Sequence, residues 1–358
     1  MIRSLWLVLL MLAATPALAQ ESKVYDGVAG PAHIVVRLTE DNEAVTGSYF
    51  YLSTRLDIAL SGQRHGQAMD LRSEVTNDRL TLTRSGDDLV GILTTGKGRK
   101  LSVSIHPAAA PLGTPPDLPV GLDLYERLRL SGLSFVRQEV ESQSDKTIRW
   151  YREPLTGIRL FRLETGYAAT AMATMNHALA QQQWSTVAAW FQCTGSGGRP
   201  GTEVDQSEKP WLGPTYVSYV WRSAWDCAGT AHPDFGAEGH SFDARSGREL
   251  RLDEVLPEGN AVIPPENSDT WLDYRSRVFA PAVVTIMKRY HPVEMALRKN
   301  GDDCNYTDPE IWAFPSWTLT EKGLWLGAIF ARADRACDSP EWSVIPWSAL
   351  PFNSVIRR

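Results

Sequence analysis

The stretch CAGTAHPDFGAEGHSFD, residues 227–243, gathers residue types that bind metal ions or activate nucleophiles. Imidazole and carboxylate groups from His232, Asp234, His240 and Asp243 could in principle bind a divalent metal ion. Their spacing matches no established zinc signature, and the HExxH pattern is absent from the chain. We therefore expect a structural turn here and no metal site.

Nucleophilic catalysis finds little support in the same stretch. Ser241 lies in Gly-His-Ser-Phe-Asp, which lacks the second glycine of the G-x-S-x-G elbow and precedes a predicted strand instead of a helix. The Gly-rich loop TGSGGRPG, residues 194–201, lacks the lysine and the following serine or threonine of a phosphate-binding loop. The sequence therefore predicts no catalytic residue, no cofactor and no enzymatic activity.

Aromatic side chains suggest binding more than catalysis. The chain has 13 tryptophans, and several lie in or near the predicted strands of its second half. Most are expected in the core, but a few at exposed strand ends could stack on glycan rings or anchor a protein partner. We take Trp225, His232, Asp234 and His240 as the candidate binding residues.

Strands and helices must position these side chains. TYVSYVWRSAWDC, residues 215–227, places large apolar residues at alternate positions, as a strand does. Residues 167–190 repeat apolar side chains at three- and four-residue steps and predict a helix. FPSWTLTEKGLWLGAIFARA, residues 314–333, predicts a β-hairpin. This mixture favours an α+β domain over residues 120–358, in which an antiparallel sheet packs with two or three helices.

The chain before residue 120 has a different rhythm. Alternating segments such as HIVVRLTE, LTLTRSG and KLSVSIH recur between turn residues over positions 20–106. They predict an N-terminal all-β domain, either a meander or a sandwich. PAAAPLGTPPDLP, residues 107–119, is too rich in proline and alanine for regular ladders and is expected to be a linker. The sequence thus predicts two domains.

The first residues indicate export. Arg3 is followed by an apolar run and by Ala17-Leu18-Ala19, which is the pattern of a signal peptide over residues 1–19 that is cleaved before Gln20. No later stretch approaches the length of a membrane-spanning helix, so we expect a periplasmic protein without stable membrane insertion. The formal net charge of −6, which becomes −7 when Arg3 is removed, argues against nucleic acid as a partner. Oligomeric state is left open.

Four cysteines remain after the predicted cleavage, and an even number in an oxidising compartment predicts two disulfides. None of them forms a CxxC pattern. Three connectivities are possible, and we favour Cys193–Cys227 with Cys304–Cys337 because each pair lies within one local stretch.

Two longer segments resemble a known family. They are YVSYVWRSAWDCAGTAHPDFGAEGHSFDARSGRELRLDEVL, residues 216–256, and WTLTEKGLWLGAIFARADRACDSPEWSVIPWSALPF, residues 317–352. Both resemble the RsiV-like domain of unknown function, which occurs in the extracytoplasmic part of the RsiV anti-sigma factor and in the non-catalytic part of the peptidoglycan deacetylase PdaC. The resemblance covers most of residues 120–352 and implies an extracytoplasmic binding role.

The sequence as a whole therefore predicts a non-enzymatic binding module of the cell envelope. A peptidoglycan fragment, a lysozyme-like protein or another envelope protein is each a possible ligand. The alternative is a metal-dependent envelope hydrolase that uses residues 232–243.

Overall fold

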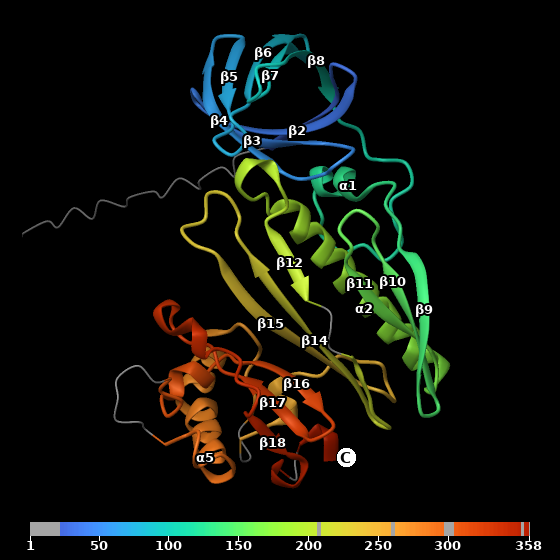
Figure 1. Ribbon diagram of the computed structural model, residues 1–358, viewed down its shortest axis with the longest axis vertical. Coiled ribbons are helices and arrows are strands. Elements are labelled where there is room, and N and C mark those ends of the chain that lie inside the picture. Colours follow the sequence, from blue (N-terminus) through green and yellow to red (C-terminus); the bar gives the residue numbers. More distant parts are fainter. Residues whose placement is uncertain (1–21, 206–208, 259–261, 297–303, 352–353, 358) are drawn as a thin grey trace, which may run out of the picture. The chain divides into compact units, whose positions relative to one another are not determined.

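The computed structural model describes residues 22–205, 209–258, 262–296, 304–351 and 354–357 (Figure 1). The predicted signal peptide, residues 1–19, lies outside these ranges. The chain divides into two compact units. The first holds the described residues up to Tyr49 together with Ala59–Ala109, and the second holds Phe50–Ile58 together with the described residues from Ala110 onward. The change after Ala109 falls within the segment 107–119.

The first unit is a closed antiparallel barrel in which eight strands follow one another in sequence order. Strand β1 pairs with β2 and also with β8, where Tyr25 lies opposite Pro107 and Ala29 opposite Val103. The strands are β1 (Ser22–Ala29), β2 (Ala32–Asp41), β3 (Ala44–Tyr51), β4 (Ile58–His65), β5 (Ala68–Arg72), β6 (Arg79–Ser85), β7 (Asp88–Thr94) and β8 (Lys100–Pro107).

The prediction of a meander or a sandwich for this part is wrong, because the sheet closes on itself. The alternation that predicts strands is present, since Leu80 and Leu82 of β6 are buried and their neighbours are exposed. Closure needs strong local curvature as well. At Gly91 of β7 a Cβ atom would collide with the carbonyl oxygen of Thr81 on β6, so only glycine permits this close approach of the two strands.

The second unit holds three separate small antiparallel sheets. The prediction of an α+β domain built on an antiparallel sheet is therefore wrong for this part too. Its strands are short and interrupted by long connections, and no hydrogen-bonded ladder among the described residues joins the three sheets into one. The sheets are β9 (Val136–Gln143), β10 (Lys146–Arg152) and β11 (Arg159–Thr165); β12 (Thr202–Asp205), β13 (Trp211–Leu212), β14 (Tyr216–Trp225) and β15 (Asp234–Asp243); and β16 (Ser316–Thr320), β17 (Gly323–Gly327) and β18 (Val344–Pro346).

Helices are few, and one of them is long. Helix α2 contains neither glycine nor proline and is rich in alanine, the best helix former. The helices are α1 (Leu124–Leu130), α2 (Ala169–Gln192), α3 (Leu252–Val255), α4 (Asp269–Tyr274) and α5 (Ala280–Tyr290). Shorter helical turns are η1 (Ser196–Gly198), η2 (Arg275–Phe279), η3 (Pro309–Trp312), η4 (Arg332–Cys337), η5 (Trp347–Ala349) and η6 (Val355–Arg357).

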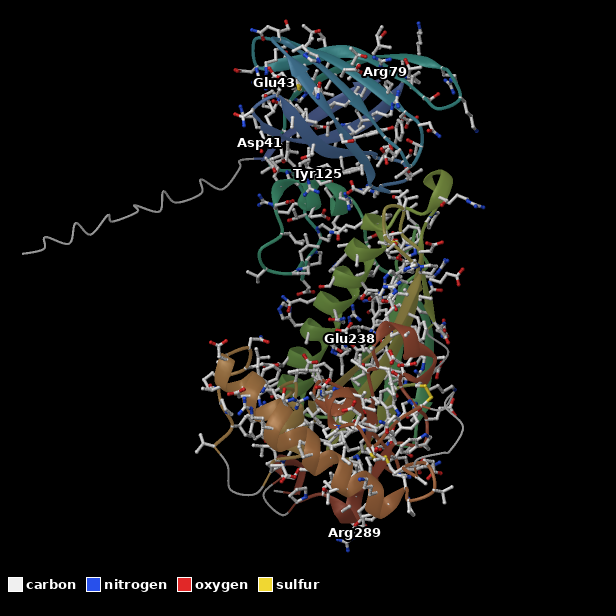
Figure 2. All side chains as sticks on the ribbon, turned by 90° about the vertical axis from the view of Figure 1, so that its left-hand side faces the viewer. Asp41, Glu43, Arg79, Tyr125, Glu238 and Arg289 are labelled. Carbon is white, nitrogen blue, oxygen red and sulfur yellow. A yellow bond between two sulfur atoms is a disulfide. The ribbon has the colours of Figure 1, made fainter. Side chains whose placement is uncertain are left out.

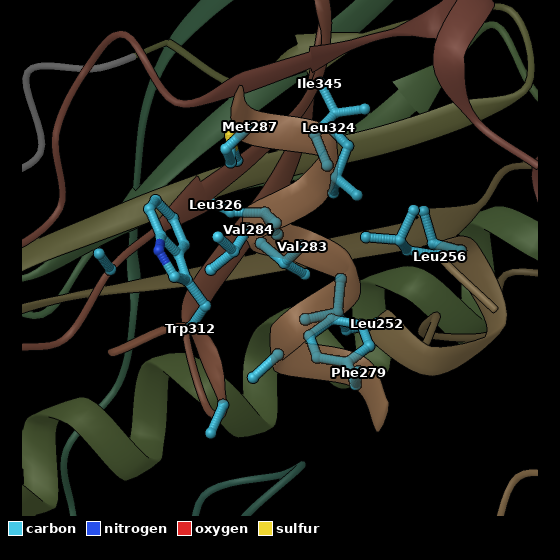
Figure 3. Packing of buried hydrophobic residues seen from close by; sticks show 14 of the residues in the cluster. Leu252, Leu256, Phe279, Val283, Val284, Met287, Trp312, Leu324, Leu326 and Ile345 are labelled. Atoms are coloured by element: carbon cyan, nitrogen blue, oxygen red, sulfur yellow. The ribbon is translucent and has the colours of Figure 1, made fainter. Parts of the chain in front are cut away.

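Two hydrophobic clusters stabilise the second unit. In the first, α2 packs on β10, β11 and β14, and its core includes Phe161, Trp184 and Phe191. In the second, α5 packs on β17 and β18 around the fully buried Trp312, as Figure 3 shows. Each fully buried large side chain contributes about 1.5–3 kcal/mol relative to an exposed one.

Hydroxyl groups connect β16 to the β14–β15 hairpin. Ser218 of β14 and Ser241 of β15 lie opposite each other and are almost completely buried. The hydroxyl of Ser218 donates to the carbonyl oxygen of Leu319, and the N–H of Leu319 donates to Oγ of Ser241 at 3.1 Å. Two side chains thus satisfy both backbone groups of one residue on an edge strand.

The segment Phe50–Ile58, which contains the end of β3, its connection to β4 and the first residue of β4, belongs to the second unit. Its Asp57 accepts hydrogen bonds from Arg129 at 2.7 Å and from the hydroxyl of Tyr125 at 2.6 Å, both on α1 (Figure 2). The side chain of Arg129 is completely buried, and its second carboxylate neighbour, Glu126, lies 3.5 Å away. Asp57 therefore neutralises a charge inside this unit.

Both disulfides have the predicted pairing. Cys193 at the end of α2 is bonded to Cys227 after β14, and Cys304 is bonded to Cys337 at the end of η4. Two such bonds fit a protein that is exported to an oxidising compartment. Within the described ranges, no helix has both the length and the hydropathy that a membrane span requires.

Candidate functional site

Trp225 is the last residue of β14 and lies at the turn end of the β14–β15 hairpin. In register it stands between Thr202 of β12 and Asp234 of β15. Its ring lies over Gly236, where a Cβ atom would come within 3.7 Å of the indole. The side chain is half-buried, and its indole N–H has no hydrogen-bond partner among the residues that the structure describes. One part of the ring is therefore supported by backbone and another part is accessible.

The Gly-rich loop after α2 forms a second wall beside Trp225. The N–H of Gly201 donates to the Cys193 carbonyl at 2.9 Å, and the N–H of Asp226 donates to the Gly201 carbonyl at 2.8 Å. A Cβ atom on Gly201 would lie 2.8 Å from Sγ of Cys193, so the loop passes against the Cys193–Cys227 disulfide as only glycine allows. The disulfide and the backbone hydrogen bonds thus fix the loop at its base.

A cavity of about 570 Å³ lies between this loop and the hairpin end, and we call it the hairpin-tip pocket. Trp225 lines it together with the charged residues Arg199, Glu203, Asp226 and Asp234. The side chains of Glu203 and Asp226 make no hydrogen bond or ion pair within the described part of the chain. An aromatic face next to several acceptors can bind a ligand that has both an apolar surface and hydrogen-bond donors.

Asp234 is held as a carboxylate. Partial burial alone would raise the pKa of Asp234, but hydrogen bonds from the Phe235 N–H and from Arg335 lower this pKa. The Arg335 guanidinium donates to Asp234 at 2.7 Å and to the Phe235 carbonyl at 3.0 Å, and it lies 3.2 Å from Asp338. Helical turn η4 is thereby attached to the start of β15.

The other candidate residues lie elsewhere. His232 is exposed in the turn before β15, where Thr230 Oγ1 donates to the Cys227 carbonyl at 2.7 Å. His240 is buried on β15, 2.7 Å from Glu249 and 3.4 Å from Glu238 (Figure 2). Burial alone would lower the pKa of His240, but hydrogen bonding to these two glutamates raises this pKa to about 9.

The four predicted binding residues therefore do not form one site. A strand rises about 3.3 Å per residue, which puts His240 about 20 Å from Asp234 along β15 and prevents the two from sharing one ion. In the ranges that the structure describes, no group of three or more His, Cys, Asp or Glu side chains is placed to hold a metal ion. Asp243 accepts from the Arg245 N–H at 2.8 Å, as expected for a turn. Trp225 and Asp234 share the hairpin-tip pocket, and His232 and His240 do not line it.

Sequence reasoning missed a second cavity, which surrounds Arg162 of β11. The available signal was the segment Arg159–Leu163, RLFRL, in which a charged residue occupies the middle of an apolar run. A charged residue inside an apolar run points to a special environment, but its partners cannot be identified before the fold is known.

Searches against protein-family models and against curated proteins found no match to this chain.

Proposed function

We propose that this protein is an exported, non-enzymatic binding protein of the bacterial cell envelope and that its hairpin-tip pocket binds a glycan. Peptidoglycan fragments are the ligand class, since the pattern of residues 1–19 directs the chain to the periplasm. The resemblance of residues 216–256 and 317–352 to the RsiV-like domain supports an extracytoplasmic binding role. The two disulfides fit an exported protein.

The supporting observation is the accessible ring of Trp225 beside three carboxylates in a cavity of about 570 Å³. A pyranose ring presents C–H groups on its faces and hydroxyl groups around its edge. The indole face is apolar and complements the C–H groups, while carboxylates accept hydrogen bonds from the hydroxyl groups. Glu203 and Asp226 are suited to this because their oxygens have no partner within the described residues.

The electrostatics of Asp234 favour ligand binding over acid catalysis by this residue. Glycoside hydrolysis needs one carboxyl group that stays protonated near neutral pH so that it can act as an acid. The pKa of Asp234 is shifted the other way, because hydrogen bonds from Phe235 and Arg335 outweigh its partial burial. Asp234 is thus suited to accept hydrogen bonds and unsuited to donate a proton.

The test is calorimetric titration of residues 20–358 with soluble muropeptides, that is, disaccharide-peptide fragments of peptidoglycan. We expect Trp225→Ala to weaken binding at least about 10-fold, as loss of an aromatic contact in a binding site does. Trp190→Ala is the matched control, because Trp190 is half-buried on α2 and does not line the pocket. The Trp190→Ala variant should bind the muropeptides with the same affinity as the unaltered protein.

Three results would contradict the proposal. Absence of heat at millimolar muropeptide, or equal weakening by the two tryptophan substitutions, would exclude the pocket as the glycan site. Chromatography of the muropeptides after overnight incubation should show them unchanged, and cleaved or deacetylated products would contradict the non-enzymatic role.

A further inference from the structure

A separate cavity of about 540 Å³ lies in the second unit beside helix α2 and the sheet of β9, β10 and β11. Figure 1 shows α2 running next to this sheet. Aromatic side chains and a single arginine dominate its walls, and we call it the arginine pocket. Its lining includes Phe135, Tyr151, Arg162, His177 and Trp184.

Arg162 is a buried cation without a carboxylate partner. Arg162 is only 9 % exposed. Its guanidinium donates to the carbonyl of Phe161 at 2.8 Å and to Oε1 of Gln183 at 2.9 Å. Both acceptors are neutral, and no ion pair to Arg162 occurs in the described part of the chain. A guanidinium has five N–H donors, so donors remain for a ligand.

The neighbouring arginines show how unusual this is. Arg149 donates to Glu164 at 2.6 Å and Arg159 donates to Glu139 at 2.6 Å, and both are more exposed than Arg162. Burial lowers the pKa of Arg162 to about 10, so it keeps its charge at neutral pH. Asp117 acts on this charge from a distance without forming an ion pair with it. A buried charge without a paired carboxylate is costly, and an anionic ligand would compensate that cost.

Gln183 fixes the geometry around the guanidinium. Its amide nitrogen donates to the carbonyls of Tyr151 at 2.9 Å and Ile158 at 3.2 Å, which directs Oε1 toward Arg162. Gln183 is fully buried, so this orientation is held by packing as well as by hydrogen bonds. The arginine side chain is therefore positioned before any ligand arrives, which reduces the entropy lost on binding.

Aromatic rings make the remaining walls apolar. The guanidinium carbon of Arg162 lies 5.7 Å from the ring centre of Phe135 and 5.5 Å from that of Tyr151. Phe135 stacks on Trp184 with ring centres 4.0 Å apart, and the indole N–H of Trp184 donates to the Pro116 carbonyl at 3.1 Å. These walls favour a flat or apolar body attached to the anionic group.

We propose that the arginine pocket binds a small monocarboxylate with a ring-sized apolar body. A carboxylate matches the planar guanidinium and can accept two parallel hydrogen bonds from it. A phosphate group carries more negative charge, and Asp117 and Glu164 also line the cavity, which disfavours a dianion. His177 lies 2.7 Å from Asp117 and is already engaged there.

The probe is 4-phenylbutyrate, titrated by calorimetry into residues 20–358 at pH 7. We expect binding at millimolar concentration or better. The neutral analogue 4-phenylbutyramide should bind at least about 10-fold more weakly, because it removes the charge-assisted hydrogen bonds. Arg162→Gln should reduce the affinity for the carboxylate by a similar factor. The amide comparison uses the unaltered protein and does not depend on whether the variant folds.

Arg159→Gln is the matched control, because Arg159 lies on the same strand but is paired with Glu139 and does not line the pocket. It should bind 4-phenylbutyrate like the unaltered protein. The proposal is overturned if the carboxylate does not bind at 10 mM, if the amide binds equally well, or if Arg162→Gln leaves the affinity unchanged. Displacement of the carboxylate by equimolar inorganic phosphate would overturn the assignment to carboxylates.

Discussion

Removal of the negative charge of Asp57 should destabilise the second unit by about 3 kcal/mol, because it leaves Arg129 buried without adequate compensation. The side chain of Arg129 is 0 % exposed and that of Asp57 is 17 % exposed. Asp57→Asn preserves shape and an oxygen acceptor, so the loss is mainly electrostatic. Breaking a buried pair by removing one partner costs about 3–5 kcal/mol, and the partial exposure of Asp57 favours the lower end.

Glu126 cannot replace Asp57. It lies 3.5 Å from Arg129, farther than Asp57 at 2.7 Å. Burial raises the pKa of Glu126 despite its arginine neighbour, so its charged form is itself disfavoured. For a unit of this size, 1 kcal/mol corresponds to about 2–4 °C in melting temperature, and we therefore expect a decrease of about 6–12 °C.

Tryptophan fluorescence during thermal unfolding is a suitable assay. Apart from Trp6, every tryptophan lies between Ala110 and Arg358, so the signal reports on the second unit alone. Glu139→Gln is the control, since it breaks a surface pair with Arg159 in which the side chains are 47 % and 35 % exposed. Such a pair contributes less than about 1 kcal/mol. Equal melting temperatures for the two variants would refute the role assigned to Asp57.

Two further predictions concern other parts of the structure. The pKa of His240 is raised to about 9, so the protonated imidazole stabilises the folded protein. This stabilisation is complete at pH values below the ordinary histidine pKa of about 6.5 and is lost as the pH rises toward 9. Between pH 6 and pH 9.5 the unaltered protein should therefore lose about 3 kcal/mol more stability than His240→Gln in fluorescence-monitored urea titrations. Identical losses would contradict the ion-pair assignment. In the barrel, Gly91→Ala should destabilise the first unit by at least about 2 kcal/mol, because the new methyl group meets the Thr81 carbonyl. Calorimetry should show this as a lower melting temperature of the first unit, and an unchanged melting temperature would show that the strands can separate there at little cost.

Local features of the fold were predictable from the sequence. The helix expected at 167–190 is α2 at Ala169–Gln192, and the hairpin expected within 314–333 is formed by β16 and β17. The disulfide pairing was also predicted, because both bonds join residues within one local stretch. All three depend on patterns that neighbouring residues carry.

The errors concern contacts between residues that are distant in sequence. Barrel closure pairs Tyr25 with Pro107, and alternation within each strand does not identify this partner. The same limit applies to the three separate sheets of the second unit, since the same strand patterns fit one continuous sheet. Long-range pairing depends on curvature and on side-chain packing that become visible only in the folded chain.

The candidate site was partly predictable for a similar reason. Trp225 and Asp234 were chosen from residue type and lie in one pocket, because they are opposite each other across a hairpin. His240 was chosen on equal grounds, but its strand carries it away to Glu249. Arg162 was missed because its surroundings come from α2, β10 and residues 116–135, which are separated in the sequence.

The two serines that meet Leu319 have a consequence for how the chain selects its final alignment. A regular ladder repeats every two residues, so a strand can slip by one repeat and recover most of its hydrogen bonds. Ser218 and Ser241 bond to the carbonyl and the N–H of Leu319, which point to the same side of β16. A slip of β16 by a single residue would turn these groups away and leave buried hydroxyls unpaired. The arrangement also occupies backbone groups on an edge strand that another chain could otherwise use for pairing. Two hydroxyl groups thus oppose both single-residue slippage of β16 and its pairing with another chain.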